Sequence, residues 1–503
     1  MATENQNFSS RWMFIITAIG SAVGLGNIWR YPFIVYANGG GAFLVPYFIA
    51  LIIAAFPVLM VEFLVGSRYK GAAPLAFARI SKKYEWIGWL PTIVAAMIVY
   101  YYVAVLAWAA NYVIFATTRA WGDNPGAFFQ GDFLGTPASP FYITSINFSI
   151  LIALVGLWGA TYYVCSKGVS SGLEAIMKVV MPFVFIFFIG LAIFSVTLDG
   201  GVLGLNALFT PDLSRFTDPR IWVAAFGQVF FSVSACMGIM ITFGSYRKRG
   251  SEFVNSSLVI TFGDSLISMI AAVSIFGILG HMAYMQGVGV ADVAASGPGL
   301  VFATLPVAFN LMGGMGPVIG TAFFLAVLVA GWSSFVTLSE AMVTPFAEKF
   351  NFPRKKAYGI ICFSGFFLSV IYSTNVGLLL IGIVGYVLDY ALAFGGLMTA
   401  LVVSWFAKGK DGRPLVYELM DYANEGSIIK AGTWFVVLLK YILPAVIISI
   451  MALWIIDLPN SSHAQQPTDV LLVFYGGSAA LIIIPIIVFS KLRWRLDVDN
   501  YDK

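Results

Sequence analysis

The residues best suited to chemistry in this chain interrupt its first long apolar segment. Residues 20–32 read Gly-Ser-Ala-Val-Gly-Leu-Gly-Asn-Ile-Trp-Arg-Tyr-Pro. Three glycines and a proline make an unbroken helix unfavourable there. Within hydrocarbon, bared peptide groups are tolerated only where they line a cavity or bind a ligand. The stretch therefore predicts a binding site, in which carbonyl oxygens suit a cation and half-helix N–H groups suit a carboxylate.

A second interruption lies in the apolar segment 220–246. Residues 232–238, Ser-Val-Ser-Ala-Cys-Met-Gly, place small and polar side chains near its middle. This is the sixth apolar segment, five after the first. Breaks at matching places in two groups of five segments predict inverted repeats, 11–197 and 220–406, with the binding site between the half-helices near the bilayer midplane.

The elements that position these residues are predicted by composition and apolar length. Of 503 residues 60% are hydrophobic and only 10% charged, with a mean hydropathy of +0.89, whereas a soluble domain carries about a quarter charged residues. We expect an all-α polytopic membrane protein forming one integral domain, 1–503. Its twelve apolar segments, each long enough to cross about 30 Å of hydrocarbon, are 12–36, 42–67, 87–116, 143–164, 174–197, 220–246, 254–283, 317–348, 355–374, 378–406, 431–456 and 468–490.

The basic residues predict how the chain is oriented. If the N-terminus and every even connection are cytoplasmic, 23 lysines and arginines lie on that side and 3 on the other. The positive-inside rule then places both termini in the cytoplasm. The first segment is too long for a signal-peptide core and is expected to remain in the mature protein. Residues 284–316 are expected to form a short helical hairpin over the outer mouth, and the three cysteines predict neither disulfides nor a metal site.

Five motifs together resemble the neurotransmitter:sodium symporter family, prokaryotic type, which has the leucine-transporter fold. They are residues 20–32, Asn-Gly-Gly-Gly-Ala-Phe-Leu-Val-Pro-Tyr at 38–47, Glu62, Tyr101-Tyr102, and Ala-Gly-Trp-Ser-Ser at 330–334. The resemblance extends from about residue 8 to about residue 456. It implies a secondary active transporter rather than an enzyme, which imports an amino acid together with Na⁺ by alternating access through the cell inner membrane.

The resemblance implies two sodium sites built from hard oxygen donors. The first would use the substrate carboxylate and four residues of the chain: Ala22 (carbonyl), Asn27, Ser232 and Asp264. The second would use three carbonyls and two hydroxyls, those of Gly20, Val23, Ala330, Ser333 and Ser334.

Asp264 distinguishes this chain from animal members of the family, which carry asparagine there and use a nearby chloride ion. The other groups of that chloride site are similar here: Tyr47, Gln228, Ser232 and Ser268. A carboxylate in a dry site supplies the negative charge that chloride would otherwise provide. We therefore expect transport without chloride, with Asp264 as the chloride substitute and a candidate for protonation in the return step.

The substrate prediction depends on position 24. Family members that carry amines have aspartate there, whereas Gly24 leaves room for the carboxylate of an amino acid. The carboxylate would meet the N–H groups of Leu25 and Gly26 and the hydroxyl of Tyr102, and the amino group would meet polar groups of Ala22, Phe231 and Ser234. An apolar or aromatic side chain would be surrounded by Ile98, Phe231, Met237, Ser334 and Leu338.

Gating residues are also implied by the resemblance. On the outer side Arg30 would pair with Asp389, with Gln228 as a bridge, above Phe231. On the inner side Tyr246 and Glu348 resemble the cytoplasmic latch, but Asn5 and Phe8 replace its usual arginine and tryptophan, so a differently built inner gate is expected. Glu62 would accept N–H groups from the unwound sixth segment, while Glu340 and Lys440 have no assigned role.

The sequence also bears on three other classes of function. An enzyme is disfavoured because the chain has only two histidines, no metal-ligand spacing, and no strand before Gly24-Leu-Gly26 for a dinucleotide fold. A channel is disfavoured because it would require an open pore, whereas the expected closure beneath Phe231 favours alternating access. A proton-driven amino-acid transporter using Asp264 remains the alternative, since replacement of Na⁺ by K⁺ or choline would leave its uptake intact.

Overall fold

The fold is helical throughout the part of the chain that can be described. The computed structural model describes residues 7–461 and 463–498, in which helices are joined by turns and only two isolated β-bridges occur. Ten helices in this part are long and apolar enough to cross a membrane, and a bent helix pair makes up to eleven. The prediction of an all-α polytopic membrane protein is confirmed at this level.

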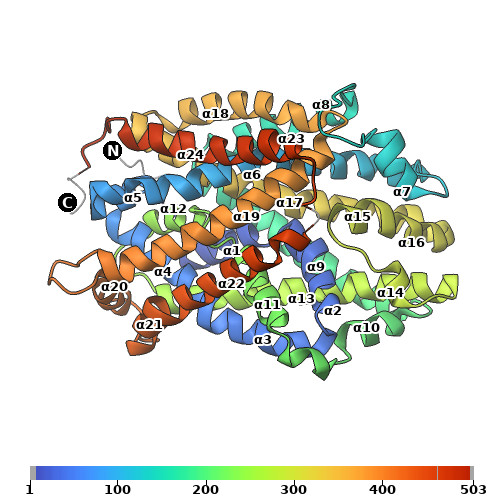
Figure 1. Ribbon diagram of the computed structural model, residues 1–503, viewed down its shortest axis with the longest axis horizontal. Coiled ribbons are helices and arrows are strands. Elements are labelled where there is room, and N and C mark those ends of the chain that lie inside the picture. The colour runs from blue at the N-terminus through green and yellow to red at the C-terminus, as the bar shows by residue number, and fades with distance from the viewer. Residues whose placement is uncertain (1–6, 462, 499–503) are drawn as a thin grey trace.

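The ten candidate spans run largely side by side along the long axis of the molecule (Figure 1). Their helices are α3 (Leu44–Ala50) with α4 (Phe56–Tyr69), α6 (Glu85–Thr118), α8 (Phe148–Cys165), α9 (Ala175–Thr197), α13 (Phe253–Gln286), α17 (Gly316–Phe350), α18 (Arg354–Ser369), α19 (Gly377–Leu401), α21 (Thr433–Val437) with α22 (Leu443–Asp457), and α23 (Thr468–Val470) with α24 (Gly476–Lys491).

The first and sixth predicted segments are each divided into two helices. The first consists of α1 (Arg11–Ala22) and α2 (Tyr31–Ala37), and the sixth of α11 (Pro219–Ser232) and α12 (Ile239–Ser245). Neither half of the sixth segment is long enough to cross a bilayer by itself. Both breaks fall where the sequence predicts them.

Shorter elements connect the spans. The remaining helices are α5 (Ala73–Ile80), α7 (Pro125–Ala127), α10 (Gly201–Phe209), α14 (Val290–Val293), α15 (Gly297–Gly299), α16 (Leu305–Leu311) and α20 (Leu415–Asn424). π-helical turns occur at Gly26–Arg30, Leu51–Ala55, Phe128–Phe133, Val169–Glu174, Leu300–Thr304, Val402–Phe406, Leu438–Ile442 and Leu471–Tyr475, and 3₁₀ turns at Gly40–Phe43, Lys82–Tyr84, Leu213–Thr217, Gly313–Met315, Val370–Ser373 and Leu458–Asn460. Helices α14 to α16 lie within residues 284–316, where the sequence predicts a short helical hairpin.

Small residues allow the helices around the breaks to approach closely. A Cβ at Gly204 of α10 would lie 1.6 Å from the carbonyl oxygen of Phe276 in α13, and a Cβ at Gly66 of α4 would lie 1.8 Å from that of Ile241 in α12. Close backbone approach of this kind drives helix association in membranes, where lipid is as apolar as the side chains. The Gly66 contact packs α12, one half of the interrupted sixth segment, directly against α4.

Candidate ion- and substrate-binding site

The break between α1 and α2 exposes peptide groups in the interior of the protein. Val23 adopts an extended backbone after α1, with φ −72° and ψ 108°, and the two helices are bent by 55°. The regular i to i−4 hydrogen bonding of an α-helix stops here. Side chains from other helices take over as partners.

The second break, residues 233–238, is held by a carboxylate from α4. Ser234, Cys236 and Gly238 have positive φ angles of 53°, 64° and 71°. Non-glycine residues in this region store strain, which tends to occur at functional sites. The Cys236 N–H donates to Glu62 Oε1 at 2.7 Å, which confirms Glu62 as an acceptor for the unwound segment.

Asn27 is the centre of a buried polar cluster that joins both breaks to α13. Its Nδ2 lies 2.8 Å from Asp264 Oδ1, 3.2 Å from Ser232 Oγ and 2.7 Å from Ser268 Oγ, and its Oδ1 accepts the N–H of Gly24. Ser232 Oγ also donates to Asp264 Oδ2. Three of the residues predicted for the first sodium site, Asn27, Ser232 and Asp264, are therefore in mutual contact.

The Asp264 carboxylate and the Ser232 and Ser268 hydroxyls supply oxygens that suit a small hard cation, whereas Asn27 turns its amide nitrogen toward them and its oxygen toward the Gly24 N–H. Carbonyl, hydroxyl, amide and carboxylate oxygens are the ligands that hard cations prefer. Gln228 lies four residues before Ser232 on α11, is fully buried, and has no hydrogen-bond partner for either polar atom of its side chain among the described residues. Buried orphan polar atoms are rare in native proteins and indicate an ion or a water molecule as their partner.

The second predicted sodium set also comes together, where α17 crosses α1. Ser333 Oγ donates to the carbonyls of Gly20 at 3.0 Å and Ala330 at 2.7 Å, and Ser334 Oγ donates to the carbonyl of Val23 at 2.9 Å. All five predicted oxygen donors thus lie at one helix crossing.

Between the two clusters lies a cavity of about 80 Å³. Its lining includes all ten residues predicted to bind substrate: Ala22, Leu25, Gly26, Ile98, Tyr102, Phe231, Ser234, Met237, Ser334 and Leu338. The other lining residues are Ser21, Gly24, Asn27, Trp29, Tyr101 and Ser232, so the described lining carries no charged side chain. Such a cavity suits a solute whose own charges are met by peptide groups, hydroxyls and a bound ion.

Two glycines of the first break determine the shape of this cavity. A Cβ at Gly24 would lie 2.7 Å from Ser334 Oγ and 2.9 Å from the Tyr102 hydroxyl. A Cβ at Gly26 would lie 2.5 Å from the Phe231 ring. The glycines therefore keep the N–H groups of the break accessible from the cavity.

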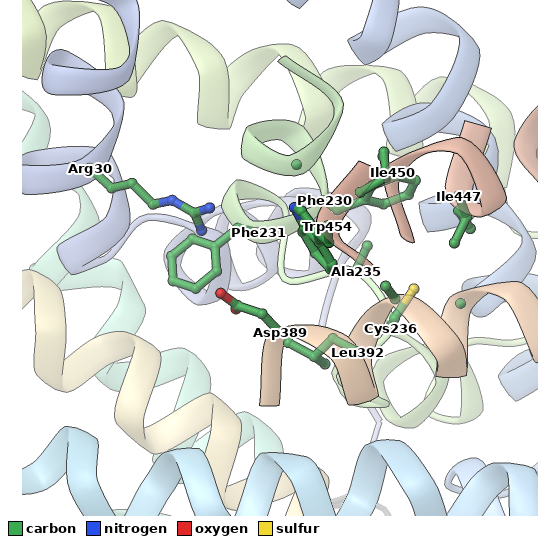
Figure 2. Close-up of a pocket in the computed structure, with 13 residues that line it drawn as sticks. Arg30, Phe230, Phe231, Ala235, Cys236, Asp389, Leu392, Ile447, Ile450 and Trp454 are labelled. Carbon is green, nitrogen blue, oxygen red and sulfur yellow. The ribbon is translucent and has the colours of Figure 1, made fainter. Parts of the chain in front are cut away.

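Of the residues predicted for the outer gate, Arg30, Phe231 and Asp389 line a neighbouring cavity of about 60 Å³, and Gln228 does not (Figure 2). The Arg30 guanidinium is 4.6 Å from the centre of the Phe231 ring, and Arg30 and Asp389 both line this cavity. No Arg30–Asp389 ion pair within 4.0 Å is found in the described chain, and Gln228 does not bridge them. The predicted pair is thus close to the Phe231 ring but not joined in this structure.

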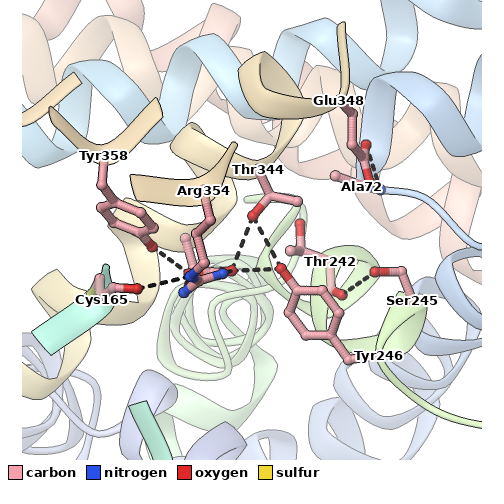
Figure 3. Close-up of polar contacts among 10 residues, drawn as sticks. Ala72, Cys165, Thr242, Ser245, Tyr246, Thr344, Glu348, Arg354 and Tyr358 are labelled. Carbon is pink, nitrogen blue, oxygen red and sulfur yellow. Dashed lines mark hydrogen bonds and ion pairs between the residues drawn. The ribbon is translucent and has the colours of Figure 1, made fainter. Parts of the chain in front are cut away.

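At the expected cytoplasmic end, Tyr246 and Glu348 are not paired with each other (Figure 3). The Tyr246 hydroxyl donates to Glu340 Oε1 at 2.5 Å, and both oxygens of Glu348 accept the Ala72 N–H, at 3.1 and 3.0 Å. Glu340 also forms a bidentate ion pair with Arg354 of α18. Glu340, which the sequence left without a role, is the acceptor for Tyr246.

The N-terminal segment is held by packing and by other polar contacts. Phe8 packs edge-on against Phe14 and Phe243, and Ser9 donates to the buried Glu174 through its N–H and its hydroxyl. Asn5 lies outside the described residues. The N-terminal segment is therefore attached to the helix bundle by an aromatic side chain and a serine–glutamate contact.

Some lining residues were not predicted as contacts. Ser21, Trp29 and Tyr101 all belong to the motifs of the sequence, but none of them was assigned a contact with the substrate. Lys440 does not face the cavity, since its Nζ lies 4.5 Å from the Trp405 ring centre.

Comparison of the sequence with known protein families identifies the family of this chain. The Sodium:neurotransmitter symporter family matches residues 5–128 and 122–494. The chain belongs to this family of sodium-dependent transporters and is not an enzyme.

Its relatives include archaeal and animal proteins. The chain is 32% identical over 496 residues to an uncharacterized sodium-dependent transporter of Methanocaldococcus jannaschii, covering 97% of this chain and 98% of the relative. It is 28% identical over 441 residues to the sodium- and chloride-dependent GABA transporter 2 of Mus musculus, covering 80% and 73%. Identity to the human sodium- and chloride-dependent taurine transporter is 27% over 462 residues, covering 83% and 74%.

Proposed function

We propose that this protein imports a neutral, apolar or aromatic L-amino acid together with two Na⁺ ions, by alternating access and without chloride. The observation that carries the proposal is that the ion cluster and the cavity share residues. Asn27 and Ser232 belong to the Asp264 cluster and also line the uncharged cavity. An ion and a zwitterion held there would neutralise each other in a medium of low dielectric constant, which couples their binding.

The substrate's charged ends have separate partners in this proposal. Its carboxylate binds Na⁺, the N–H groups of Leu25 and Gly26, and the hydroxyl of Tyr102, which already lies 3.4 Å from the Leu25 nitrogen. Its amino group binds the carbonyls of Ala22 and Phe231 and the Ser234 hydroxyl. The side chain occupies the apolar part of the cavity.

Ser334 links the cavity to the second sodium site. Its hydroxyl bonds the Val23 carbonyl, and its side chain also lines the cavity. A sodium ion at Gly20, Val23, Ala330, Ser333 and Ser334 would hold α1 against α17. Its release toward the cytoplasm would free α1 to move, which is the step that opens the inner side.

The membrane arrangement in this proposal is the one predicted from the sequence. The bent pair and the two halves of the sixth segment, together with ten spans, would give twelve crossings in a 5+5 inverted repeat. Both termini would lie in the cytoplasm, with the protein in the inner membrane of a prokaryotic cell. Arg30 and Asp389 would meet above Phe231 when the outer side closes.

The test is uptake of labelled amino acids into liposomes that contain the purified protein. With an inward Na⁺ gradient we expect accumulation, which collapses when K⁺ or choline replaces Na⁺. Competition by a panel of unlabelled amino acids identifies the substrate class. Uptake that continues in choline under an inward proton gradient would support the alternative, a proton-coupled transporter using Asp264, and would refute sodium coupling.

A further inference from the structure

The chain beyond α24 folds back over the end of the molecule where α5 and α6 meet. Figure 1 shows this C-terminal segment passing the end of α5. Residues 492–498 follow α24 without regular secondary structure. Trp494 and Val498 are side chains of this segment that contact the helix bundle.

The first anchor is the buried carboxylate of Glu85, which binds side chains of two helices, α6 and α17, and of the tail. Trp494 Nε1 donates to Glu85 Oε2 at 2.9 Å. The other oxygen of Glu85 accepts from Trp89 Nε1 at 3.0 Å and from Lys349 Nζ at 2.5 Å. Lys349, whose side chain is fully buried, also lies 4.2 Å from the Trp494 ring centre, and its carbonyl accepts the Arg495 N–H. The tryptophan therefore adds a hydrogen bond and a ring contact to the ion pair between α6 and α17.

The second anchor attaches the tail to α5. Val498 is buried against Leu75 and Ala78 of that helix, with Trp494 packed beside them. The Val498 carbonyl accepts a hydrogen bond from Arg79 Nε at 3.0 Å.

Arg79 extends these contacts toward the inner gate. Its Nη1 donates to the carbonyls of Tyr69 and Lys70, at the end of α4. Lys70 Nζ in turn donates to the carbonyl of Arg247, the residue after Tyr246. Hydrogen bonds thus lead from the tail, through α5 and the end of α4, to the residue adjoining the Tyr246–Glu340 contact.

The tail is mostly exposed to solvent and lies outside the helices that form the bundle. Arg493 and Arg495 are exposed, Trp494 is half-buried, and the tail adds no span to the helix bundle. Segments with few buried apolar contacts open at a lower free energy than the fold as a whole. Departure of Trp494 would leave the Glu85–Lys349 pair intact but open to water.

We propose that residues 492–498 form a strap that holds the inner side of the transporter closed, and that release of Trp494 favours opening of that side. The strap holds α5 and the end of α4 in place while Tyr246 is bonded to Glu340. Its release loosens the end of α4 and the chain around Arg247. The transport consequence rests on the proposed function, whereas the structural consequence does not.

The experiment measures hydrogen–deuterium exchange of the full-length protein in detergent or nanodiscs. Trp494→Ala is expected to raise amide exchange in residues 69–80 and 244–248 by about tenfold, as loss of a hydrogen bond to a charged partner allows. Arg493→Ala, an exposed change in the same tail, is the matched control and should leave exchange unchanged. Because exchange requires no ion or substrate, a failure of the proposed symport would not obscure the result.

Exchange that rises only within residues 492–498, or nowhere, would overturn the proposal. Arg79→Gln provides a second test, because it removes the link to Val498 and to the end of α4 while leaving Trp494 in place. It should raise exchange in the same two segments, and unchanged exchange there would refute the strap even if Trp494→Ala failed to fold. In liposomes both variants should release preloaded amino acid faster than Arg493→Ala, and equal release would contradict the effect on the inner side.

Discussion

Replacing Asp264 with asparagine removes a fixed negative charge from the cluster around Asn27 while preserving the size of the side chain. The carboxylate oxygens lie 2.8 Å from Asn27 Nδ2 and 2.5 Å from Ser232 Oγ. A cation held by the same residues therefore feels this charge at close range. At about 4 Å and an effective dielectric constant of about 20, the attraction is about 4 kcal/mol.

Loss of that attraction should weaken sodium binding by about 10³-fold where nothing replaces the charge. In chloride-free medium, such as sodium gluconate, we expect uptake by Asp264→Asn to be lost at Na⁺ concentrations that saturate the unmodified protein. In NaCl we expect substantial recovery, because Tyr47, Gln228 and Ser268 remain to hold chloride. The unmodified protein should transport equally in both media.

The assay is initial uptake into liposomes over a range of Na⁺ concentrations, with chloride or gluconate as the anion. Thr261→Val is the matched control, because it changes a buried side chain about one turn away on α13 without altering charge. The reasoning is refuted if the unmodified protein requires chloride, or if Asp264→Asn keeps its sodium affinity in gluconate.

Three further predictions concern the first helix break and the packing of α10 against α13. Asn27→Ala should abolish uptake while expression persists, because the contacts of its side chain amide to Asp264, Ser232 and Ser268 disappear; unchanged sodium dependence would contradict the first ion site. Gly24→Ala should weaken substrate binding at least about tenfold, as measured by scintillation proximity, since its Cβ would lie 2.7 Å from a serine hydroxyl; unaltered affinity would remove the glycine from the site. Gly204→Ala should lower thermal stability by about 1–3 kcal/mol through overpacking, whereas Gly190→Ala, which meets open space, should not; equal melting temperatures would disprove the close helix contact.

The sequence predicted the site well because the interruption of a membrane helix is a local and costly feature. Glycines, an asparagine and a proline within an apolar segment must break the helix wherever it packs. The structure accordingly places both breaks at the expected residues, and the ten predicted cavity residues line one cavity. The family resemblance supplied which helices face each other.

The gates were harder to predict because they depend on where long side chains reach. Tyr246 bonds Glu340 rather than Glu348, which lies eight residues later and accepts a backbone N–H from the start of α5. Both glutamates lie on α17, so spacing alone does not say which one meets the tyrosine. The strap likewise gives no signal in the sequence, since Trp494 and Val498 lie in a short charged tail.

The sequence by itself determined the all-helical membrane class, the two broken segments and the family, because each follows from local composition and backbone chemistry. Only the tertiary structure decided which buried carboxylates receive which donors and how the C-terminal segment reaches α5. Those contacts join different elements of the chain, 94 positions apart for Tyr246 and Glu340 and 419 for Arg79 and Val498, and their partners are set by the packing of whole helices rather than by any pattern within one of them.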